Sequence, residues 1–137
     1  MTKIENSQKI GIRLHPKFKH HFIMDNIKRG DVIYVDLTPP HGKEMTKARP
    51  CVVLSVDVFN QSSPLLVICP ITDAYGKNSP IHVFIPKGIA GCKKDSVVHC
   101  GQIRVIDSEE RVIKKLSTMP IEYMKNIEDG LRILLGL

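Results

Sequence analysis

Arg49, Thr72 and Glu44 are the side chains whose types and positions best fit chemistry on a phosphate group. A guanidinium stays charged and can donate two parallel hydrogen bonds to phosphate oxygens. A threonine hydroxyl at a strand end can donate another, and a loop carboxylate can accept a proton from a hydroxyl within its reach. Together they would supply the cation, the donor and the base that cleavage of a phosphodiester requires.

Each of these residues also has an ordinary structural interpretation, which the residues alone leave open. Arg49 could be a surface arginine paired with Glu44 or Asp73. Thr72 could close its strand in a Ser/Thr turn. Glu44 could be a solvated carboxylate that pairs with a neighbouring lysine or with Arg49.

Short apolar runs separated by turn residues would position these groups on a small, curled antiparallel sheet. We expect strands over residues 32–37, 51–54, 65–71, 81–85, 96–100, 102–106 and 112–116. A polar turn is expected over residues 57–64, and a bulge or sharp bend at Gly101.

The only clear helix signal is C-terminal. Apolar residues recur there at three- and four-residue steps, at Ile121, Met124, Ile127, Leu131 and Leu134. Thr118 is the expected N-cap, with Pro120 in the first turn and Gly136 at the exit. Gly130 is unfavourable inside a helix and indicates close packing.

The charge distribution separates a basic start from a nearly neutral remainder. Residues 1–29 carry seven Lys/Arg and two Asp/Glu, and residues 30–137 carry thirteen against twelve. The net charge of +6 therefore says little about the domain itself. We expect residues 1–26 to be a flexible basic extension, with contact to nucleic-acid phosphates or an acidic partner as the alternative. Residues 27–137 would form one domain.

The sequence gives no signal for a membrane, a disulfide or a metal. It has no signal peptide and no apolar run long enough to span a bilayer, so we expect a cytoplasmic protein without membrane contact. The four cysteines lack a Cys-x-x-Cys spacing and are expected to be reduced. His15, His20 and His21 lack ligand spacing, so no metal or other cofactor is expected.

Four short motifs occur in a distinctive order. Arg29-Gly30-Asp31 precedes the first apolar run, a Pro- and Gly-containing loop leads to Glu44, Arg49-Pro50 opens the second run, and Pro70-Ile71-Thr72 closes the third. No single motif is specific. The ordered set, over residues 27–137, resembles the MazF/PemK family of toxin endoribonucleases.

The resemblance implies a fold, an activity and partners. The fold would be mainly β with α, a small SH3-like β-barrel of the CcdB/MazF type with a C-terminal helix. The activity would be sequence-specific, metal-independent cleavage of single-stranded RNA, expected to be mRNA, leaving 2′,3′-cyclic phosphate and 5′-hydroxyl ends. The partners would be a second copy in a homodimer and a cognate MazE-like antitoxin with a disordered, acidic tail in the RNA groove.

The resemblance also implies residue roles. Arg49 matches the family's catalytic arginine and Thr72 its catalytic hydroxyl residue, and Glu44 matches the loop glutamate and would take the 2′-OH proton. We expect RNA contacts from His41, Lys43, Lys47, His99 and Gln102.

The chain departs from some relatives at two places. Lys43 stands where some carry a histidine, and His41 nearby is a candidate replacement. His99 and Gly101 stand where some carry an arginine and an aspartate, so an Arg/Asp acid–base scheme does not carry over. His99 would be an acid, a base contact or a packed strand histidine.

Two other functions use the same fold. CcdB-like proteins poison DNA gyrase through a tryptophan near the C-terminus, and this chain has no tryptophan. An SH3-like binding module without activity is the second alternative, which the sequence leaves open.

Overall fold

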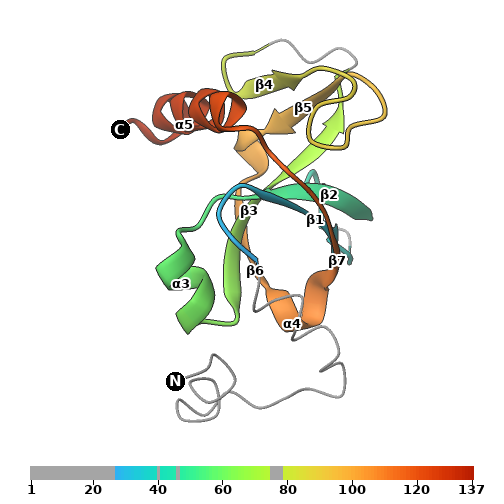
Figure 1. The fold of residues 1–137 in the computed structure, drawn as a ribbon, viewed down its shortest axis with the longest axis vertical. Helices are drawn as coiled ribbons and strands as arrows, with labels where there is room; N and C mark the ends of the chain where they lie inside the picture. Colours follow the sequence, from blue (N-terminus) through green and yellow to red (C-terminus); the bar gives the residue numbers. More distant parts are fainter. Residues whose placement is uncertain (1–26, 40, 46, 75–78) are drawn as a thin grey trace.

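The computed structural model describes residues 27–39, 41–45, 47–74 and 79–137 (Figure 1). The strands of this part are β1 (Asp31–Asp36), β2 (Ala48–Val53), β3 (Leu65–Asp73), β4 (His82–Ile85), β5 (Ser96–His99), β6 (Arg104–Asp107) and β7 (Val112–Thr118). The helical segments are α3 (Asp57–Ser62), the 3₁₀ turn η2 (Cys100–Gln102), α4 (Ser108–Arg111) and α5 (Ile121–Leu135). The strand order is β4-β5-β3-β2-β1-β7, and β6 pairs with β3.

β3 joins the two halves of the sheet. Its first residues pair with β6 and its last with β5, both antiparallel, while β2 lies along its other edge. Because successive side chains of a strand point to opposite faces, the same strands feed two apolar clusters. Cys51 and Ile68 belong to the cluster inside the curl, and Val52 and Cys69 to the cluster on the other face.

α5 covers the second cluster and lies across β4 at one end of the molecule (Figure 1). Its buried residues are Met124, Ile127 and Gly130. A Cβ at Gly130 would meet Cys100 Sγ at 3.2 Å and the Pro80 carbonyl oxygen at 3.3 Å. The glycine therefore lets the helix sit directly against η2, which confirms the close packing expected from the sequence.

The Arg29-Gly30-Asp31 motif is a structural junction at the start of β1. The Arg29 guanidinium donates to the Leu54 carbonyl and to Glu128 on α5, the latter at 2.6 Å. The Asp31 carboxylate is buried, accepts from the Lys28 N–H at 2.8 Å and pairs with Lys115 on β7 at 3.3 Å. The motif thus ties the first strand to the last strand and to the last helix.

The expected fold class is confirmed: a mainly antiparallel β structure with a C-terminal helix. The sheet is curled but does not close into a barrel. Within the described residues β6 pairs with β3 and β7 with β1, and no ladder joins β6 to β7. The short helix α4 lies between these two strands in the chain. The basic extension expected over residues 1–26 lies outside the described residues.

The structure differs from the sequence-based expectations at several element boundaries. Residues 57–62 form α3 where a turn was expected, and buried Asn60 fixes it by donating to the Ser55 carbonyl at 2.9 Å. Thr118 ends β7 and is not the N-cap of α5, a position that Pro120 takes. Gly101 lies in the 3₁₀ turn, which makes the sharp bend that was expected there.

Two further elements differ from the expectations. α4 was not expected; the Asp107 side chain caps it by accepting from the N–H groups of Glu109 and Glu110. β2 begins at Ala48, so Arg49 lies within the strand and not before it. No helix in the described part is both long enough and apolar enough to cross a bilayer.

Candidate functional site

Arg49 and Thr72 lie side by side at the ends of two paired strands. β2 and β3 pair with Cys51 opposite Pro70, and continuing this register by two residues places Arg49 opposite Thr72 on the same face. The Arg49 Nη1 donates to the Thr72 Oγ1 at 3.2 Å, and both residues are partly exposed. The structure therefore brings together two of the three expected catalytic residues.

A second arginine, Arg104, shares this face and was not expected from the sequence. It opens β6 directly opposite Ile68, whose side chain belongs to the cluster inside the curl. Burial raises the pKa of the Cys51 thiol to about 12, and the positive charges of Arg104 and Arg49 oppose that rise. Both guanidinium groups therefore act on the same buried sulfur, and this thiol is not a thiolate nucleophile at neutral pH.

Gln102 fixes the loop that carries Glu44. Its Oε1 accepts from the Met45 N–H at 3.1 Å, and its Nε2 donates to the Lys43 carbonyl at 3.4 Å. The two bonds flank Glu44 in the chain, so one carboxamide holds the backbone on both sides of it. The side-chain amide of Gln102, which was expected to contact RNA, is thus engaged in positioning the loop.

Other contacts hold the same loop at its two ends. Arg111 donates to the carbonyls of Asp36 and Thr38 at the end of β1. The Leu37 N–H donates to the Lys47 carbonyl at 2.9 Å, with Lys47 at a positive φ of 71°. The loop is therefore anchored where it leaves β1 and where it enters β2.

Glu44 is exposed and faces a hollow of about 300 Å³. The hollow is lined by Lys43, Glu44, Gly101, Gln102, Ile103 and Arg104. Within the described residues, the Glu44 carboxylate forms no ion pair, so the structural pair with Arg49 considered from the sequence is not present. Asp73, the other suggested partner of Arg49, pairs with Lys94 at 3.3 Å.

The remaining expected RNA contacts fall into two groups. His41, Lys43 and Lys47 are exposed on the loop, and the His41 carbonyl accepts from the Glu44 N–H at 3.1 Å. His99 is partly buried, and its ring lies edge-on to that of His82 with centroids 4.3 Å apart. A Cβ at Gly101 would come within 3.0 Å of the His99 ring, so the glycine provides the space for this packing.

Sequence reasoning missed the positioning role of Gln102 and the presence of Arg104. For Arg104 a signal existed, because it opens an apolar strand as Arg49 nearly does. For Gln102 no local signal existed, since its bonds span 57 and 59 residues of chain. No group of three or more His, Cys, Asp or Glu side chains is placed to hold a metal in the part of the chain that the structure describes.

Replacing Gln102 by leucine should release the Glu44 loop without unfolding the sheet. Each lost bond is worth about 1 kcal/mol, which corresponds to roughly fivefold faster exchange of the Met45 amide hydrogen. Hydrogen exchange measured by NMR checks this. Ser62→Ala, which removes a hydrogen bond on α3, serves as control and should leave Met45 unchanged. Unchanged Met45 exchange in the leucine variant would show that the carboxamide does not hold the loop.

Comparison with known proteins supports one family for the whole described domain. Residues 28–135 match the family model described as PemK-like, MazF-like toxin of type II toxin-antitoxin system. The chain is 38% identical over 112 residues to Endoribonuclease MazF of Staphylococcus epidermidis, which covers 81% of this chain and 92% of that protein.

Solved structures agree with this match. The crystal structure of MazF from Deinococcus radiodurans aligns with a TM-score of 0.71 and 27% identity, covering 81% of this chain and 97% of that one. A MazE-MazF crystal structure from the same organism aligns with a TM-score of 0.63 and 26% identity, covering 81% and 97%. The ordered motifs, the curled sheet and these similarities show that the chain belongs to the PemK/MazF family of toxins of type II toxin–antitoxin systems.

Proposed function

We propose that this protein is a sequence-specific, metal-independent endoribonuclease that cleaves single-stranded RNA, with mRNA in the cytoplasm as its target. The hydrogen-bonded pair of Arg49 and Thr72, held at the ends of two paired strands, carries this proposal. The Staphylococcus epidermidis relative, named an endoribonuclease, supports it.

RNA supplies its own nucleophile, because the 2′-OH next to a phosphate can attack it in line. Glu44 takes the proton from that hydroxyl. Arg49 and Thr72 stabilise the charge that develops on the phosphate oxygens. Arg104 adds a second guanidinium, beside the hollow that Glu44 faces. The products are then a 2′,3′-cyclic phosphate and a 5′-hydroxyl end.

The donor to the leaving 5′-oxygen is one of the basic side chains near this face. Arg49 donates a hydrogen bond to Thr72, which is proposed to hold the phosphate with it, and His41 is on the loop that leads to β2. His99 is held against His82, which suits a structural role better than a proton donor. Arg49 is therefore the first candidate to test.

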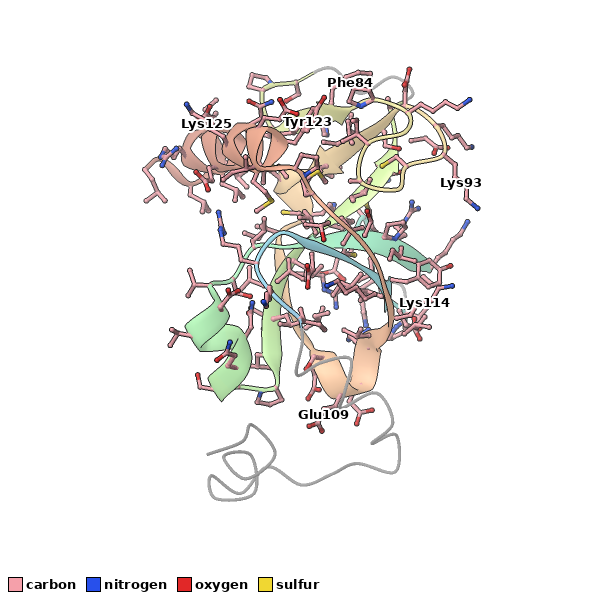
Figure 2. The ribbon with its side chains drawn as sticks, viewed as in Figure 1. Phe84, Lys93, Glu109, Lys114, Tyr123 and Lys125 are labelled. Carbon is pink, nitrogen blue, oxygen red and sulfur yellow. The ribbon has the colours of Figure 1, made fainter. Side chains whose placement is uncertain are left out.

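The protein acts as a homodimer and is silenced by an acidic MazE-like antitoxin segment that covers the candidate site. The MazE-MazF structures of the Deinococcus radiodurans relative support the antitoxin. Exposed apolar side chains on β4 and α5 support the dimer: Phe84 is 51% exposed, Ile133 62% and Leu135 54%. Phe84 and Ile133, together with Tyr123, line one shallow depression. Figure 2 shows Phe84 and Tyr123 at this end of the molecule. A patch of this kind on a soluble protein marks an interface.

Arg49→Ala should abolish most of the cleavage and leave the fold intact. Removal of one charged contact to the transition state costs about 10²–10³ in kcat. The rate on a long mRNA, with circular dichroism as the check on folding, measures this, and growth inhibition on expression should vanish as well. If the alanine variant cleaves RNA at the wild-type rate, Arg49 is not a catalytic residue.

Cleavage should proceed in EDTA and should stop when the attacking hydroxyl is absent. A substrate with one 2′-deoxy nucleotide immediately 5′ of the scissile phosphate keeps its bases and phosphates, so it should bind normally and remain uncut. End analysis of the products of ordinary RNA should find 5′-hydroxyl groups. Loss of activity in EDTA, or 5′-phosphate products, would point to an attacking water and a metal ion.

Phe84→Ser combined with Ile133→Ser should convert the dimer to a monomer, because both substitutions place a hydroxyl in an apolar interface. Light scattering at micromolar concentration measures the change. Val58→Ser on α3, where the valine is 78% exposed, removes a similar apolar side chain elsewhere and should leave the dimer intact. A monomeric wild-type protein at this concentration would contradict the proposal.

A further inference from the structure

A second cavity, of about 530 Å³, lies on the sheet face opposite the candidate site. Its walls come from β1, β2, β7 and the end of β3, and from the loop between β4 and β5. The lining residues are Val32, Tyr34, Pro50, Asp73, Ala90, Gly91, Cys92, Lys93, Lys94, Lys114 and Leu116. Its size is that of a small-molecule or single-residue binding site.

The cavity lies directly behind the Arg49–Thr72 pair. Pro50 follows Arg49 in β2 and Asp73 follows Thr72 in β3, and successive strand residues point to opposite faces. The two sites therefore share the same strand ends and differ only in the face they use. A polymer bound at one site can reach the other by passing around these ends.

The chemistry of the cavity combines apolar walls with a positively charged rim. Tyr34 and Pro50 offer flat apolar surfaces on neighbouring strands, and they face each other in the β1–β2 register. Lys94 is engaged with Asp73, whereas Lys93 and Lys114 form no ion pair within the described residues. Figure 2 shows these two lysines projecting on the same side of the molecule.

We propose that this cavity is a second RNA-contact site, which takes a nucleotide of the strand that also occupies the candidate active site. Tyr34 and Pro50 contact the base, and Lys93 and Lys114 contact the adjoining phosphates. The inference rests on the proposed function, because it assigns the cavity to the same substrate. The flat apolar surfaces of Tyr34 and Pro50 can stack on a base while the two lysines contact its phosphates. The carboxylates of an acidic peptide would contact only the lysines and leave the apolar surfaces without a partner.

Lys93→Ala combined with Lys114→Ala tests the phosphate contacts. The probe is a fluorescein-labelled 20-nucleotide 2′-O-methyl RNA of random sequence, which the enzyme cannot cleave because the 2′-oxygen is blocked. We expect the Kd measured by fluorescence anisotropy to rise about tenfold. The slope of log K against log salt should fall in magnitude by about 1.4, since each phosphate contact to a single strand contributes about 0.7. Lys28→Ala with Lys125→Ala is the matched control, because both lysines are exposed and neither lines the cavity. It should change the Kd less than twofold.

Tyr34→Leu tests the base contact separately. Leucine keeps apolar bulk and loses the ring, so affinity should fall about tenfold while the salt slope stays at the wild-type value. Urea unfolding checks that this partly buried substitution leaves the domain folded.

Three outcomes would overturn the proposal. The first is equal RNA affinity for the Lys93/Lys114 variant and its control. The second is that the Lys93/Lys114 variant loses binding to a polyglutamate peptide while its RNA binding is unchanged, which would assign the cavity to an acidic peptide. The third is conversion of dimer to monomer by the lysine variant, which would assign it to an interface. Because the probe is uncleavable, a protein that binds it through the lysines but cuts no ordinary RNA would refute the proposed function and support this site.

Discussion

The pairing of β2 with β3 is the constraint on which the rest of the molecule depends. β3 pairs with three other strands, so both halves of the sheet take their register from it. The same register sets Arg49 opposite Thr72 and Cys51 opposite Pro70. A slip by one residue would move every side chain of β2 to the other face. The buried clusters on both faces therefore fix the position of the candidate site as well as the fold.

A second line of contacts runs from the C-terminal helix to the Glu44 loop. α5 approaches η2 closely at Gly130, and η2 contains Cys100 and Gln102 within three residues. Cys100 is fully buried against the helix, while Gln102 faces outward and holds the loop backbone. The packing of a helix at one end of the sheet thus determines where a carboxylate of the candidate site lies.

The features predictable from the sequence were those encoded by neighbouring residues. Alternating and continuous apolar runs located the strands, and the three- and four-residue period located α5. Arg49 and Thr72 became candidates through the order of the motifs along the chain, because each residue taken alone also had a structural interpretation. What was missed depends on individual side-chain contacts, which leave no periodic pattern in the sequence. α3 forms because Asn60 bonds to Ser55 in a buried position, and nothing in a polar segment of that length distinguishes it from a turn.

The two proposed catalytic parts differ in how firmly they are held. Arg49 and Thr72 stand on strands whose backbone is fixed by ladders on both sides, so the charge-stabilising groups are preorganised. Glu44 lies on a loop that one carboxamide and two end contacts restrain. Its carboxylate makes no ion pair in the described residues, so it can move toward a bound hydroxyl without first breaking one. Phosphate binding would then depend on the sheet and proton transfer on the loop. A ligand that displaces the loop would therefore stop the chemistry while the phosphate site stays formed.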